Sequence, residues 1–182
     1  MKYAGIRTAM LTLAALSVVI ALAAPSPQYV GAEKCKMCHM SKAKGDAYGI
    51  WKASKHAAAF ATLASPESQA IAKKMGIADA QKSAQCLQCH VTGHSAPPSA
   101  KAASYKLADG VGCETCHGAG SLYKEMKVMR ALHAGTQDAK TVGYRKGDKR
   151  QCVSCHNPSS PTYKPFNVEE AYKKIAHPTP KG

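Results

Sequence analysis

Two cysteines followed by a histidine recur four times in this sequence at one fixed spacing, Cys-x-x-Cys-His. The third copy is Cys113-Glu-Thr-Cys116-His117, inside the stretch GVGCETCHGAG. Two thiols at this spacing can form thioethers to the vinyl groups of a porphyrin, and the adjacent histidine can bind the iron. The pattern uses every cysteine of the chain, so we predict four covalently attached c-type haems. The attachment residues are Cys35, Cys38, Cys86, Cys89, Cys113, Cys116, Cys152 and Cys155, and the iron ligands that follow them are His39, His90, His117 and His156.

Two other uses of cysteine are alternatives to haem attachment. Eight cysteines in an exported chain can form four disulfides. Cys-x-x-Cys pairs also occur in structural zinc sites. A disulfide framework has no use for the histidine after every second cysteine, and zinc sites would leave most of these histidines unexplained. The spacing therefore favours haem over both.

Four histidines remain outside the motifs, a number equal to the number of predicted irons. A second histidine on the open side of a haem gives a six-coordinate, low-spin centre suited to electron transfer. The alternative for each is a surface or core histidine with no ligand role. One of them, His94, follows His90 by four residues, so it could serve a neighbouring haem or stay exposed in its loop. The candidates for second iron ligands are His56, His94, His133 and His177.

The N-terminus has the pattern of a secretory signal peptide. Lys2 and Arg7 precede an uncharged apolar run that ends in ALAAP. This run is shorter than the roughly 20 apolar residues that a membrane span needs, which argues against an uncleaved anchor. We predict a signal peptide over residues 1–23, cleavage before Ala24, and export to the periplasm or an equivalent compartment. Residues 24–182 are then expected to form a single domain.

The chain is strongly basic, with 25 Lys and Arg against 11 Asp and Glu and a formal net charge of +14. The propionates of four haems would offset much of this surplus. The remainder favours redox partner proteins with acidic surfaces, by electrostatic steering, and membrane contact that is at most peripheral. No basic-aromatic recognition motif is present, so nucleic acid is not expected as a partner.

The composition predicts a thin side-chain core. The chain has two Phe and one Trp, and many of its apolar residues are alanine. Four haems would fill the interior, so the apoprotein is expected to be largely disordered. No alternating strand pattern is present. We therefore predict a mainly α fold with extensive coil, organised around four covalently bound haems.

Three segments carry helix signals between the motifs. Residues 47–65 are alanine-rich and predict one helix of about three to four turns. Ser65 and Pro66 end it and begin the next helix as N-cap and first residue. Residues 121–135 predict a helix that stops at Gly135. Residues 167–178 predict a last helix with Asn167 as N-cap and Glu170 completing a capping box.

Several stretches, taken together, resemble the cytochrome c554/c-prime family of tetrahaem cytochromes. They are GAEKCKMCH, WKASKHA, CLQCHVTG, GVGCETCHGAG, CVSCHN and YKPFNVEEAYKKIAH, in this order along the chain. The resemblance implies a mainly helical protein whose haems lie in closely stacked pairs. It also implies that three of the four haems carry two histidine ligands.

The resemblance assigns second ligands to three irons. It pairs His133 with the haem on His39, and assigns His56 and His177 to the haems of the third and fourth motifs in an order that it leaves open. The haem on His90 is five-coordinate in the family, under a Thr-Pro-Phe lid. Here the matching stretch is Lys164-Pro165-Phe166, and His94 stands where the family has an aromatic residue.

Two functions are consistent with these residues. The first is an exported electron carrier, and family members of this kind accept electrons from a hydroxylamine-oxidising enzyme. The alternative is an enzyme that reduces a small molecule such as nitric oxide at the haem on His90, with His94 or Lys164 as proton donor. A third possibility is assembly of the chain into a haem-lined filament, which would show the same number of Cys-x-x-Cys-His motifs. We favour the carrier, because at least three irons are expected to be closed on both sides.

Overall fold

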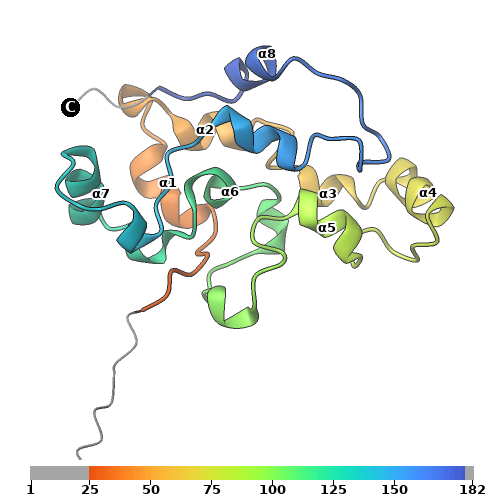
Figure 1. The fold of residues 1–182 in the computed structure, drawn as a ribbon, viewed down its shortest axis with the longest axis horizontal. Helices are drawn as coiled ribbons and strands as arrows, with labels where there is room; N and C mark the ends of the chain where they lie inside the picture. The colour runs from red at the N-terminus through yellow and green to blue at the C-terminus, as the bar shows by residue number, and fades with distance from the viewer. Residues whose placement is uncertain (1–24, 179–182) are drawn as a thin grey trace, which may run out of the picture.

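The computed structural model describes residues 25–178 and shows short helices joined by long loops (Figure 1). Between these residues no strand forms, and Tyr29 and Lys101 make one isolated bridge. The predicted mainly α fold with extensive coil is therefore confirmed. The α-helices are α1 (Glu33–His39), α2 (Ala47–Lys52), α3 (Ala59–Thr62), α4 (Pro66–Lys74), α5 (Ala84–His90), α6 (Cys113–His117), α7 (Met126–His133) and α8 (Val168–Lys173). The 3₁₀ helices are η1 (Lys42–Lys44), η2 (Pro98–Ala100), η3 (Leu107–Asp109), η4 (Gly120–Leu122), η5 (Lys140–Val142) and η6 (Lys149–Ser154).

The helices are arranged around α6, which lies near the middle of the molecule (Figure 1). Helix α1 packs against α2, α3 packs against α5 and η3, and α8 packs against η6. Helix α7 lies at one end of the molecule and α4 at the other. The predicted signal peptide, residues 1–23, lies outside the described residues. No helix in the described part of the chain has the length and apolar character to cross a membrane.

Some local predictions are confirmed. Ser65 caps α4 through its hydroxyl, which accepts a hydrogen bond from the backbone N–H of Ser68 at 3.1 Å, and Pro66 is the first residue of that helix. Gly135 follows α7 with a φ of +72°, the left-handed conformation that ends many helices. Asn167 caps α8 by accepting from the N–H groups of Glu169 and Glu170.

The single helix predicted over residues 47–65 is wrong. Turns separate α2 from α3, and His56 lies in this break. The carbonyl of His56 accepts from the N–H of Ala59 at 3.1 Å and from that of Val111 at 2.9 Å. The indole of Trp51 also donates to the carbonyl of Val111, at 2.9 Å. A segment distant in sequence thus takes over the carbonyl and breaks the helix.

The other two predicted helices are shorter than expected. Residues Gly120–Leu122 form the separate η4, and the extended backbone of Glu125 (φ −74°, ψ 138°) makes α7 begin only at Met126. Helix α8 ends at Lys173, before Pro178. The predicted capping box is also wrong, because the carboxylate of Glu170 accepts from Lys173 at 2.7 Å.

The core formed by side chains alone is small. A single cluster of buried residues joins α3, α4 and α5, and no large side chain is completely buried among the described residues. The buried apolar residues are Val30, Ala32, Tyr48, Leu63, Ala72, Ala80, Leu87, Val91 and Tyr123. Burial on this scale leaves most of the helix faces without an apolar partner.

A group of buried polar residues connects the start of α1 to α6. Glu114 is only 2% exposed. Its carboxylate accepts hydrogen bonds from the N–H groups of Val30, Gly31 and Gly120 at 2.7–2.8 Å. Burial raises the pKa of Glu114, and the three N–H groups oppose this rise. The carboxylate therefore binds the chain before the first motif to the third motif.

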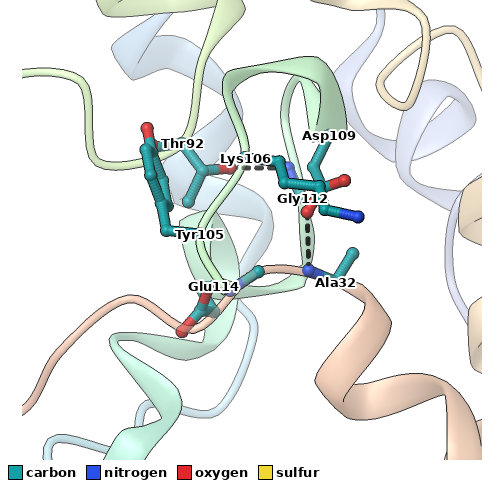
Figure 2. Close-up of a pocket in the computed structure, with 8 residues that line it drawn as sticks. Ala32, Thr92, Tyr105, Lys106, Asp109, Gly112 and Glu114 are labelled. Atoms are coloured by element: carbon teal, nitrogen blue, oxygen red, sulfur yellow. Dashed lines mark hydrogen bonds between the residues drawn. The ribbon is translucent and has the colours of Figure 1, made fainter. Parts of the chain in front are cut away.

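Asp109 and Thr92 extend this connection (Figure 2). The Asp109 carboxylate accepts from the N–H of Ala32 at 2.9 Å. The Thr92 hydroxyl accepts from the N–H of Gly112 at 2.6 Å. These residues and Glu114 line a cavity of about 10 Å³, at the lower limit for one water molecule.

Replacing Glu114 tests the connection. Glu114→Gln keeps the size of the side chain but sets an amide N–H₂ against a backbone N–H. We expect the holoprotein to lose about 2–3 kcal/mol of unfolding free energy in denaturant titrations, since a buried donor loses a charged partner. The control is Glu67→Gln at the exposed start of α4, expected to cost under about 0.5 kcal/mol. Equal stability of the two variants would contradict the role of Glu114.

Candidate functional site

Each Cys-x-x-Cys-His motif lies on a helical turn. The first three are on α1, α5 and α6, and the fourth begins in η6 and continues to His156. On such a turn, residues three and four apart share one face. The two sulfurs and the imidazole of a motif therefore lie on the same side, as attachment to one porphyrin requires. No disulfide joins any of the eight cysteines, all of which lie in the described part of the chain.

Two motif histidines have one ring nitrogen fixed by a backbone carbonyl. The Nδ1 of His90 lies 2.8 Å from the carbonyl oxygen of Ala59, and the Nδ1 of His117 lies 3.1 Å from that of Arg145. With Nδ1 as donor, Nε2 carries the lone pair that binds a metal. These histidines are oriented as iron ligands are.

The first motif contacts the third. The thiols of Cys35 and Cys113, which stand for thioether sulfurs in a haem protein, are neighbours. Their interaction and burial raise the pKa of Cys35, and the same interaction lowers the pKa of Cys113.

The second motif contacts the fourth in the same way. Burial, together with the neighbouring Cys155 thiol, raises the pKa of Cys89 to about 11. The described chain thus arranges its four motifs as two pairs, first with third and second with fourth.

The segment before the fourth motif connects the two pairs. The N–H of Arg145 donates to the carbonyl of His117 at 2.9 Å, and its guanidinium donates to the carbonyl of Thr115 at 3.1 Å. The amide of Gln151 donates to the carbonyl of Cys116 at 3.2 Å. The motifs are therefore neighbours in the order first, third, fourth, second.

An open, basic pocket lies beside the third and fourth motifs. Its volume is about 430 Å³, and its lining residues are Arg145, Lys146, Asp148, Arg150 and Gln151. Arg150 pairs with Asp148 there, so Arg145 and Lys146 are the cations left to balance propionate carboxylates. Their charge fits the propionates of a haem held by these motifs.

Two histidines outside the motifs lie opposite motif histidines. The ring centre of His56 is 6.1 Å from that of His156, and the ring centre of His177 is 5.8 Å from that of His117. Burial lowers the pKa of His56, His117 and His177, which favours the neutral imidazole that binds metals. The structure therefore brings together two of the four candidate pairs.

The remaining candidates have other surroundings. His133 is exposed at the end of α7. His94 is half-buried, and its backbone carbonyl accepts from Lys101 at 3.0 Å. Phe166, expected over His90, has its ring centre 4.8 Å from that of His156. Within residues 25–178, no group of three or more His, Cys, Asp or Glu side chains could hold a bare metal ion.

Sequence reasoning missed Glu114, Asp109 and Thr92. The sequence signal for Glu114 was an acidic residue between the two cysteines of a motif, in a chain with only 11 acidic residues. Their partners are backbone N–H groups at positions that no pattern identifies. These residues position the motifs and do not bind the cofactor themselves.

Comparisons with known proteins give one family and one relative. A family model for cytochrome c554 and c-prime matches residues 34–118, which contain the first three motifs. Cytochrome c-554 of Nitrosomonas europaea is 34% identical to this chain over 107 residues, which cover 57% of this chain and 43% of the relative. The chain thus matches less than half the length of this relative. No solved structure matches.

Gly110 offers a test of how His56 is positioned. Gly110 has a φ of +61°, and a Cβ there would lie 2.6 Å from the carbonyl oxygen of His56. We expect Gly110→Ala to lower the unfolding free energy of the holoprotein by about 1–3 kcal/mol, since alanine is strained in this conformation and displaces the His56 backbone.

The control is Gly76→Ala. Gly76 has a φ of +73°, but its Cβ would meet no atom within 4 Å. Only the backbone strain remains, about 1 kcal/mol. Denaturant titration compares the two variants, and a cost at Gly76 equal to that at Gly110 would show that the His56 contact is unimportant.

Proposed function

We propose that this chain belongs to the cytochrome c554 and c-prime family, whose model matches residues 34–118, and that it is an exported electron carrier with four covalently bound haems. The matches to this family support a c-type cytochrome, with covalent haem and a role in electron transfer. The number four rests on the four motifs. Passage between redox proteins, and export, rest on the charge surplus and on the N-terminal sequence.

The residues that would hold each haem are those of its motif. The two cysteines supply thioether bonds and the histidine supplies an iron ligand. Bound haem supplies an iron that changes between ferric and ferrous by one electron. The protein sets how closely the motifs approach one another and how far water enters.

One observation carries the proposal, the two histidine pairs that lie close to 6 Å apart. Imidazoles on opposite sides of one metal, each bound at about 2.0–2.1 Å, have ring centres separated by about 6 Å. The pairs His56–His156 and His117–His177 have this separation. We therefore assign His56 to the fourth motif and His177 to the third, an order that the sequence left open.

An iron held by either of these histidine pairs would have no position left for a substrate, which favours electron transfer over catalysis. The contacts between motifs support the same function. A line of neighbouring attachment turns, first to third to fourth to second, gives a continuous route between opposite ends of the motif set. For His133 as second ligand of the first motif, the support is the family resemblance alone.

The ligand assignment and the function are tested by paramagnetic resonance of the oxidised holoprotein. In His56→Ala, and separately in His177→Ala, we expect one low-spin signal to be lost and one high-spin signal to appear, because one iron loses its second imidazole. The control is His94→Ala, expected to leave the spectrum unchanged. A His56→Ala spectrum identical to that of the wild type would contradict the assignment.

The same spectra, recorded with nitric oxide, compare the two candidate functions. An electron carrier is expected to retain its low-spin signals in the presence of the gas. Stoichiometric binding of nitric oxide with turnover at the iron on His90 would instead support the reductase.

A further inference from the structure

The four motif turns differ in what covers their outer faces. At 100° per residue, the two residues between the cysteines point away from the thiols and the histidine. In the second motif Leu87 is buried in a cluster with Ala72 of α4. In the third motif Glu114 is buried. At the equivalent position, Lys36 of the first motif is half-buried and Val153 of the fourth is exposed (52%). At the second position between the cysteines, the first motif alone presents an exposed apolar residue, Met37 (91%).

Ion pairing differs between these two exposed turns. Near the fourth motif, Lys149 pairs with Glu169, and Arg150 pairs with Asp148. Two cations there are thus neutralised by acids of the same chain, whereas Arg145 and Lys146 make no ion pair within residues 25–178.

Near the first motif, most of the cations are unneutralised. Lys34, Lys42 and Lys44 are exposed, and none of them makes an ion pair within residues 25–178. Only Lys36 pairs there, with Glu33 at 3.8 Å.

We define the first-motif face as Lys34, Met37, Met40, Lys42 and Lys44. Its centre is apolar, with Met37 and Met40 exposed at 91% and 53%. Its rim is cationic. Protein interfaces commonly have an apolar centre enriched in methionine and a charged rim that guides the approach of a partner.

We propose that the first-motif face docks the acidic surface of a redox protein. This inference rests on the proposed electron-carrier function. The face lies on α1 and the adjacent η1, and α1 also carries Cys35, Cys38 and His39. In the docked complex, the electron lost by the partner would pass to the haem that Cys35, Cys38 and His39 would hold.

The end of α4 supplies a control surface of the same chemistry. It presents Lys73, Lys74 and Met75, all exposed. It lies at the far side of the molecule from α1 (Figure 1). Helix α4 covers the outer face of the second motif, so a partner bound there is one helix further from any attachment turn.

The test uses flavodoxin, a small acidic redox protein, as the probe. Both flavodoxin and the holoprotein are oxidised, so that binding is measured without electron transfer. Calorimetric titrations at low and high salt compare Lys42→Gln/Lys44→Gln with Lys73→Gln/Lys74→Gln, which removes the same charge. A second pair compares Met37→Gln with Met75→Gln. Stopped-flow reduction by reduced flavodoxin then gives the rate constant for each variant.

We expect Lys42→Gln/Lys44→Gln to weaken binding and slow reduction about tenfold at low salt, and the difference to shrink at high salt. The matched α4 variant is expected to change by less than about twofold. Met37→Gln is expected to weaken binding about two- to fivefold at both salt concentrations, and Met75→Gln to have no effect.

Several results would overturn the docking face. Equal effects of the two lysine variants would indicate steering by net charge alone. A wild-type protein that dithionite reduces but that does not bind flavodoxin would also contradict the proposal. Salt-sensitive binding to phosphatidylglycerol vesicles that only Lys42→Gln/Lys44→Gln loses, with flavodoxin binding unchanged, would assign the face to a membrane surface. Haem content and reduction by dithionite are measured first, so a failure of the electron-carrier function is seen separately.

Discussion

The four Cys-x-x-Cys-His turns contact one another, and the rest of the structure depends on these contacts. Cysteine thiols of the first and third turns are neighbours, and so are those of the second and fourth turns. Hydrogen bonds from Arg145 and Gln151 join the two pairs. Few apolar side chains are buried around them. The helices therefore serve mainly to hold the proposed attachment sites at short range, and the proposed haems would supply the interior that side chains lack.

Buried polar groups perform the positioning that a large apolar core performs elsewhere. Glu114 and Asp109 bind the backbone just before α1, and Thr92 binds the loop just before α6. Hydrogen bonds are directional, so they fix one relative placement of two turns more strictly than apolar contact does. In an electron carrier this matters, because the function is set by the distance and environment of each iron.

Local chemistry was readable from the sequence, and contacts between distant segments were not. The motifs, the caps at Ser65 and Asn167 and the stop at Gly135 depend on residues within a few positions of one another. The break in the helix at His56 depends on Val111, whose N–H takes the His56 carbonyl. The order of the histidine pairs was unreadable for the same reason, because only the folded chain shows which imidazoles face each other.

The central claim is that haem is bound covalently at all four motifs. The most direct measurement is the haem content of the protein purified from cells competent in cytochrome c maturation, by pyridine haemochrome absorbance together with the intact mass. We predict four haems per chain and a mass equal to the polypeptide plus four haems. A colourless, well-folded protein with eight reactive thiols, or any count other than four, would contradict the account.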